Sequence, residues 1–195
     1  SENDSFVTQI YQNLRTSIEY TIQNLDLEQI DEIAQLMNKA DIIFCAGVGN
    51  SGIPAEACAM RLGRNGKNGI YFKDNHFQSI YLNELKRSDI AILFSASGES
   101  NDTIHCAEIL KQRKVKTVCV TSSVVSSLAV LCDYCILLKR WLGPLGGGSM
   151  IGQITQMYIA DLLSTRTGMI DQKTTLKAKE TTFDYIIDKM RKERI

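Results

Sequence analysis

Five short apolar runs alternate with helical segments through the middle of the chain, and this alternation limits the possible folds more than any other feature. Each run has four or five residues, the length of a buried strand. The runs cover residues 42–46, 69–72, 90–94, 117–120 and 134–138. Helical patterns between them cover residues 55–64, 76–85, 101–113 and 127–131. Strands that alternate with helices predict an α/β fold: a three-layer α-β-α sandwich around a five-stranded parallel sheet.

Amphipathic helices are expected on both sides of this core. They are predicted at residues 5–24, 28–38, 149–165 and 174–191, the last two after a glycine-rich loop at 141–148. Asp26 is a candidate N-cap for the second of them. The first helix carries Phe6, Ile10 and Leu14 on one face, so something must cover it. A second copy of the chain and packing within one subunit both remain open.

Composition excludes several classes of protein. A chain of 195 residues suits one domain, and its net charge of zero provides no overall basic field for nucleic acid. No apolar run is long enough to cross a bilayer, and no signal peptide is recognisable. The six cysteines lie mostly within expected strands and helices. We therefore expect a cytoplasmic protein with reduced thiols and no membrane partner.

A metal site or other cofactor is not expected. Cys132 and Cys135 form one C-x-x-C pair, but a structural zinc site usually needs a second pair of ligands. Neither His76 nor His105 has the spacing of a metal ligand.

Three turns rich in hydroxyl groups follow expected strands: Gly47–Gly52, Ser95–Ser100 and Thr121–Ser123. Ligands of open parallel sheets bind beyond the carboxyl ends of the strands, where these turns meet. Helix N-termini and serine hydroxyls at such a place suit a phosphate. No lysine or arginine lies within the three turns, which favours a single phosphate over a triphosphate.

A dinucleotide site is the competing interpretation of the first turn. Gly47, Gly49 and Gly52 match the G-x-G-x-x-G fingerprint, and Asp74 lies near the end of the second strand, where a ribose-binding acid would be. The second turn, Ser95–Ser100, is not needed in such a site and favours the phosphate interpretation.

The paired motifs Gly47-Val48-Gly49-Asn50-Ser51 and Ser95-Ala96-Ser97-Gly98-Glu99-Ser100 resemble those of the sugar isomerase (SIS) domain, over about residues 28–166. The resemblance implies a flavodoxin-like or Rossmann-like sheet and a site for a sugar phosphate or amino-sugar phosphate. The ligand-binding residues that we expect are Gly49, Asn50, Ser51, Ser95, Ser97, Gly98, Glu99, Ser100, Thr121, Ser122, His76 and Gln153.

Within this family, the chain looks most like the effector domain of RpiR-type transcriptional regulators. The lead-in helix and the segments 63–66, 74–78 and 128–133 carry this likeness. It implies that residues 1–25 are a linker from a helix-turn-helix domain not present here, and that residues 26–195 are the SIS domain. DNA would be bound only through that domain, and the regulator would be a homodimer or a dimer of dimers.

A sensor is expected in preference to an enzyme. Isomerisation of a sugar phosphate needs a base, and small SIS isomerases carry a glutamate early in the helix after the last strand. Residues 148–156 here contain no carboxylate, and Asp161 is the first that follows. Glu56 and His76 are the remaining candidate bases. We expect no catalytic residue, with a phosphosugar isomerase as the alternative function.

Overall fold

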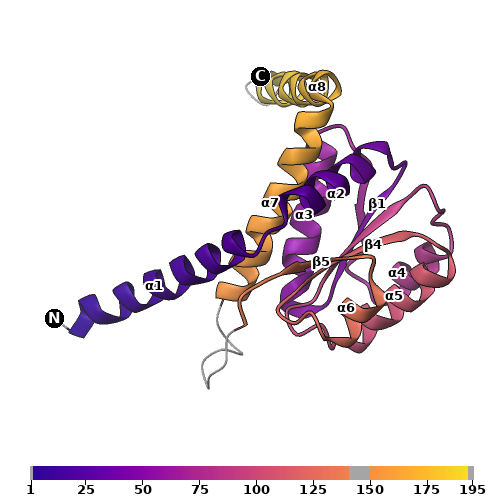
Figure 1. The fold of residues 1–195 in the computed structure, drawn as a ribbon. Helices are drawn as coiled ribbons and strands as arrows, with labels where there is room; N and C mark the ends of the chain where they lie inside the picture. Colours follow the sequence, from indigo (N-terminus) through magenta and orange to yellow (C-terminus); the bar gives the residue numbers. More distant parts are fainter. Residues whose placement is uncertain (1, 141–149, 193–195) are drawn as a thin grey trace.

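A five-stranded parallel sheet forms the centre of the computed structural model, which describes residues 2–140 and 150–192 (Figure 1). The strands are β1 (Ile43–Gly47), β2 (Gly69–Tyr71), β3 (Ile90–Phe94), β4 (Lys116–Thr121) and β5 (Tyr134–Leu137). Their order is β2-β1-β3-β4-β5, and every neighbouring pair is parallel. The structure confirms the α/β class, the five strands and the parallel sheet.

This order creates a switch point between β1 and β3. After β1 the chain moves outward to β2, and after β2 it returns to the other side of β1 as β3. Crossovers of constant handedness then place the helices after β1 and β3 on opposite faces, leaving a crevice between them. Gly47 pairs with Phe94, and Phe94 with Val120, so the turns after β1, β3 and β4 begin at nearly the same level.

Helices cover both faces of the sheet (Figure 1). The helices on one face are α2 (Leu27–Lys39), α3 (Gly52–Arg64) and α7 (Ile151–Ile170), and on the other face α4 (Asn75–Leu82), α5 (Asn101–Gln112) and α6 (Ser127–Leu131). Successive side chains of a strand point to opposite faces. Ile43 and Cys45 of β1 accordingly lie in the first of these cores, and Phe44 and Ala46 in the second.

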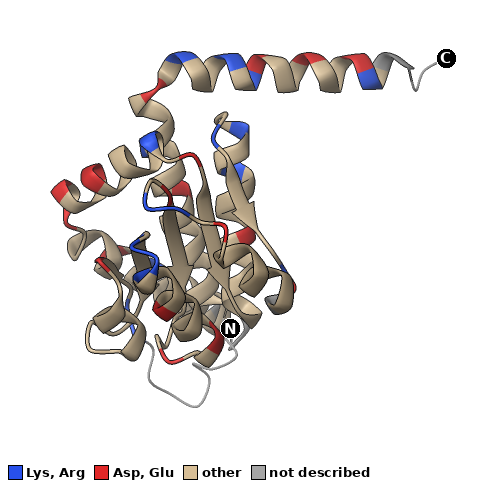
Figure 2. Ribbon diagram, turned by 90° about the vertical axis from the view of Figure 1, so that its right-hand side faces the viewer, with Lys and Arg blue, Asp and Glu red and all other residues tan. Residues whose placement is uncertain are grey.

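Two further helices extend beyond the body of the molecule. The first half of α1 (Glu2–Gln23) projects away, while its second half packs against α7, where Ser17 Oγ lies 3.0 Å from Thr155 Oγ1 (Figure 1). Helix α8 (Gln172–Lys192) projects from the end of α7 (Figure 2).

Helix α7 differs most from its predicted bounds. Expected to end at residue 165, it continues to Ile170. The residues that extend it are packed: Thr167 Oγ1 donates to the Leu163 carbonyl at 2.7 Å, and Gly168 lies against Asn65 and Thr175. Other bounds differ by a few residues. The predicted loop at 141–148 lies outside the described residues.

Candidate functional site

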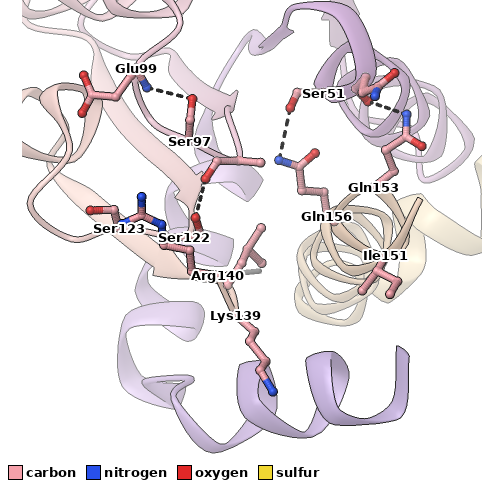
Figure 3. Close-up of a pocket in the computed structure, with 14 residues that line it drawn as sticks. Ser51, Ser97, Glu99, Ser122, Ser123, Lys139, Arg140, Ile151, Gln153 and Gln156 are labelled. Atoms are coloured by element: carbon pink, nitrogen blue, oxygen red, sulfur yellow. Dashed lines mark hydrogen bonds between the residues drawn. The ribbon is translucent and has the colours of Figure 1, made fainter. Parts of the chain in front are cut away.

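A cavity of about 400 Å³ opens at the carboxyl edge of the sheet, beside the switch point (Figure 3). It is lined by Asn50, Ser51, Ala96, Ser97, Glu99, Ser122, Ser123, Leu138, Lys139, Arg140, Ile151, Gly152, Gln153 and Gln156. The turns after β1, β3 and β4, the residues that follow β5 and the start of α7 thus meet around one space.

The turn after β3 is held by its own hydrogen bonds. The Gly98 amide donates to Ser95 Oγ, and the Glu99 amide to Ser97 Oγ, each at 3.1 Å. Gly98 has a φ of +71°, and a Cβ at this position would lie 2.2 Å from Ser126 Oγ. Only glycine fits there. The exposed Ser97 hydroxyl is therefore fixed in place at the cavity wall.

Glu99 braces the loop with its carboxylate. Ser127 donates to it from its backbone amide at 2.9 Å and from its hydroxyl at 2.7 Å. These hydrogen bonds lower the pKa of Glu99. The ionised carboxylate is thus held against Ser127, and Glu99 lines the cavity as a support of the loop.

The turn after β1 is joined to α7. Gln156 Nε2 donates to Ser51 Oγ at 3.3 Å, and Gln153 Nε2 donates to the Asn50 carbonyl at 3.2 Å (Figure 3). Gly47 allows the close turn, because a Cβ there would lie 2.3 Å from the Ser51 carbonyl oxygen. Helix α7 thus sets the position of the Ser51 hydroxyl.

The turn after β4 is tied to the turn after β3 through one carbonyl. Ser122 donates to the Ala96 carbonyl from its amide at 2.9 Å and from its hydroxyl at 2.7 Å. Thr121 Oγ1 donates to the same oxygen at 3.4 Å. Two walls of the cavity are therefore connected.

The residues expected to bind a ligand divide into three groups. Those that line the cavity are Asn50, Ser51, Ser97, Glu99, Ser122 and Gln153. Ser95, Gly98 and Thr121 are buried behind the turns, and Ser100 is the N-cap of α5, without a side-chain capping bond. Gly49 and His76 line a different cavity.

That second cavity, of about 540 Å³, lies between the turn after β1 and the end of β2. Glu56, Lys73 and Asp74 also line it. Asp74 accepts from the amides of His76 and Phe77 at 2.8 and 3.1 Å and so caps α4. Asp74 Oδ1 is thus used at the start of α4, a capping role that accounts for this residue without a ribose.

Sequence reasoning missed the basic residues of the main cavity. Lys139 and Arg140 come directly after the apolar run at 134–138, which contains β5, so they lie at the same edge of the sheet as the three turns. The signal was their position after the fifth apolar run. In Figure 3, Arg140 lies beside Ser122 and Ser123, whereas Lys139 extends toward α1. Ser123 was also absent from the expected set.

The charges and donors of this cavity suit an anion. Its lining contains four serines (Ser51, Ser97, Ser122 and Ser123) and two basic residues, of which Arg140 lies beside Ser122 and Ser123 while Lys139 extends away from them (Figure 3). Its one carboxylate among the described residues, that of Glu99, accepts hydrogen bonds from Ser127. Cations and hydroxyl donors together bind phosphate groups well.

No metal or membrane feature was found in the described parts of the chain. Over residues 2–140 and 150–192, no group of three or more His, Cys, Asp or Glu is placed to hold a metal ion. Across the same residues, no helix is long and apolar enough to cross a membrane.

The fold and cavity define a parallel α/β protein whose anion-suited crevice lies at the switch point of its sheet. The chain belongs to the SIS domain family, whose profile matches residues 36–165. An uncharacterized HTH-type transcriptional regulator of Haemophilus influenzae is 33% identical over 183 residues, covering 92% of this chain and 64% of that protein. The chain spans between about half and two thirds of the curated relatives it matches.

Solved structures agree with this assignment. The Vibrio vulnificus NanR protein complexed with ManNAc-6P gives a TM-score of 0.86 at 25% identity, covering 94% of this chain and 69% of that one. The sugar isomerase domain of the RpiR transcription factor from Sphaerobacter thermophilus gives 0.81 at 20% identity, covering 91% and 97%. The expected likeness to the SIS domains of RpiR-type regulators is confirmed.

Proposed function

We propose that this chain is the phosphosugar-binding sensor domain of an RpiR-type transcriptional regulator of carbohydrate metabolism. The observation that carries the proposal is the main cavity, where Ser51, Ser97 and Ser122 meet Arg140 while Ser127 holds the Glu99 carboxylate. The phosphate would bind at the hydroxyls, and Gln153 and Gln156 offer amide groups to the sugar. The NanR relative was solved with ManNAc-6P, which supports an amino-sugar phosphate as one candidate ligand.

Calorimetry with a panel of sugar and amino-sugar phosphates tests this proposal. We expect one of them to bind, and Ser97→Ala to weaken its affinity about 10- to 100-fold, since a hydrogen bond to a charged group contributes about 1.5–3 kcal/mol. Ser88→Ala is the matched control: Ser88 is also exposed but precedes β3 at the opposite end of the strand. Equal affinities of the two variants for the ligand would contradict the assignment.

A sensor is favoured over an isomerase because the main cavity lacks an available base. Its one described carboxylate is the hydrogen-bonded Glu99, and no Asp, Glu or His occurs in residues 139–152. A positioned base contributes about 10²–10⁴-fold to such a reaction. We therefore expect no turnover of aldose or ketose phosphates, whereas a turnover number near ~1 s⁻¹ would make the chain an enzyme.

The second cavity supports the alternative of an isomerase, because Glu56 and His76 both line it. If turnover is observed, Glu56→Gln and His76→Gln identify the base. Loss of turnover with retained binding in either variant would support the isomerase.

The remaining proposals concern a longer regulator of which this chain would be one part. In it, residues 1–25 would lead in from a helix-turn-helix domain, and only that domain would bind DNA. The regulator would be a cytoplasmic homodimer or dimer of dimers. The ligand would then act by binding two arrangements of the dimer with different affinity. Specific retardation of a DNA fragment by these 195 residues alone would contradict this division of roles.

A further inference from the structure

The first turns of α7 contact the main cavity and helix α1 at the same time. Ile151, Gln153 and Gln156 are among the residues that line the cavity. Thr155, next to Gln156 in the chain, contacts α1 instead: its Oγ1 lies 3.0 Å from Ser17 Oγ. One short piece of helix thus forms part of the candidate ligand site and part of the support of α1.

The contact between α1 and α7 is polar and buried. Helix α7 is the element that α1 contacts most extensively. Ser17 and Thr21, one turn apart on α1, are buried, as is Thr155, whereas the other described side chains of α1 are partly or fully exposed. Because buried hydroxyl groups require hydrogen-bond partners, the contact of Ser17 with Thr155 favours one position of α1 along α7.

Thr155 and its neighbour in the chain are also connected to the cavity wall. The Thr155 hydroxyl donates to the Ile151 carbonyl at 2.8 Å, and the buried Gln156 donates from Nε2 to Ser51 Oγ at 3.3 Å. Figure 3 shows another lining residue, Lys139, extending toward α1. A movement of these turns of α7 would therefore change both the cavity and the seat of α1.

A bound sugar phosphate would hold this part of α7 more firmly. The phosphate would accept a hydrogen bond from the Ser51 hydroxyl, and the oxygen of the same hydroxyl can still accept from Gln156. Hydrogen bonds in such a chain strengthen one another. The sugar would bind the amide groups of Gln153 and Gln156. Both effects reduce the fluctuations of the first turns of α7, and a second contact on these turns then costs less entropy.

We propose that Thr155 is a positioning residue that couples occupation of the main cavity to the position of α1, through its contact with Ser17. The inference rests on the proposed function and adds to it the path by which binding is transmitted. In a longer regulator, α1 would lead in from the DNA-binding domain, so its position would carry the signal out of the sensor. Coupling of this kind is reciprocal: loss of the contact with α1 also weakens the binding of ligand.

Hydrogen exchange on the 195-residue chain tests the coupling. The probes are inorganic phosphate and each sugar phosphate that calorimetry shows to bind, with chloride at the same ionic strength as the control. Slower exchange in the turns at 95–100 and 121–123 reports binding itself. We expect the amides of residues 17–23 to exchange at least about twofold more slowly with ligand, because α1 opens less often when its seat on α7 is fixed.

Variants assign the coupling to the hydroxyl group. Thr155→Val keeps the shape of the side chain and removes its hydroxyl, whereas Thr155→Ser keeps the hydroxyl. We expect Thr155→Val to abolish the protection of α1 by ligand and to weaken ligand affinity at least about twofold, and Thr155→Ser to retain both. Ser17→Ala should reproduce the effect of Thr155→Val from the other side of the contact.

Thr16→Ala is the matched control, because the exposed Thr16 hydroxyl donates to the Gln12 carbonyl of its own helix at 2.7 Å. It should leave the coupling intact. A role of Thr155 in packing alone would change the exchange of α1 equally with and without ligand. That result, or protection of the turns without protection of α1, would overturn the coupling and leave the proposed function standing. Failure of every phosphate compound to protect the turns would overturn the proposed function, and the coupling with it.

Discussion

Close contacts at single residues hold the walls of the cavity in place, even where neighbouring side chains are exposed. The turn after β3 shows this at Gly98, which combines a positive φ with contact to Ser126 and Thr121. A side chain at this position would move the turn and, with it, Ser97 and Glu99. The close contacts of Gly98 therefore contribute both to the stability of the protein and to the shape of the cavity.

Gly98→Ala should lower the free energy of unfolding by about 1–3 kcal/mol, because the new Cβ meets Ser126 in a strained backbone conformation. Gly63→Ala is the control: Gly63 lies in α3, and a Cβ there meets nothing within 4 Å. That change should stabilise the protein by up to about 1 kcal/mol. Urea unfolding measures the free energy of unfolding of both variants. Equal effects of the two substitutions would show that the position of Gly98 has no special requirement for glycine.

Glu99 makes part of the stability depend on acid pH. Hydrogen bonds from Ser127 lower the pKa of Glu99 in the folded state. Its contribution to stability is therefore present above the unfolded pKa of about 4.3 and disappears as the pH falls through the lower folded value. Thermal unfolding of Glu99→Gln and the unaltered chain should therefore converge below about pH 4. A difference in melting temperature between the two proteins that stays the same at every pH would exclude this role for the carboxylate.

At the scale of elements, α7 connects the core to the candidate site. Ile159 and Leu163 pack in the core with α2 and α3, while Gln153 and Gln156, toward its N-terminus, bind the turn after β1. An ion pair with Arg166 Nε 2.6 Å from Asp31 Oδ1 adds little, because both side chains are partly exposed. Apolar packing is what positions this helix.

Leu163→Ala should therefore cost about 2–5 kcal/mol of unfolding free energy, the usual result of emptying a fully buried leucine site. Leu27→Ala makes the same chemical change at an exposed position on α2 and should stay within about 0.5 kcal/mol. Chemical denaturation of both variants gives the comparison. A small loss for Leu163→Ala would mean that α7 is held by other contacts.

The elements that sequence predicted well are those whose signals are local. The five apolar runs and the cap of α2 by Asp26 depend on neighbouring residues alone. The extension of α7 past residue 165 was not predictable, since it depends on packing of Gly168 against Asn65. The sequence likewise could not show that His76, expected among the ligand-binding residues, lines the cavity beside β2 and not the main one.

At the scale of the whole molecule, the two projecting helices carry a large part of the exposed apolar side chains. Phe6 and Ile10 of α1 are 57% and 58% exposed, and they share a face with Ser17 and Thr21, which are buried near α7. Helix α8 carries a second stripe of exposed apolar side chains at Leu176, Phe183, Ile186 and Met190. Such contiguous surface is typical of an interface between copies of a chain.

We therefore predict a homodimer in which the first half of α1 packs on a second copy. Light scattering at micromolar concentration should give twice the 21.8 kDa chain mass. Phe6→Glu combined with Ile10→Glu should give the monomer, because charge on this stripe cannot be buried without a partner. Thr8→Glu with Gln12→Glu adds the same charge to the opposite side of the helix and should remain dimeric. A monomer for the unaltered chain would exclude the dimer, and dissociation by both pairs of substitutions would show that charge alone, and not this face of α1, is responsible.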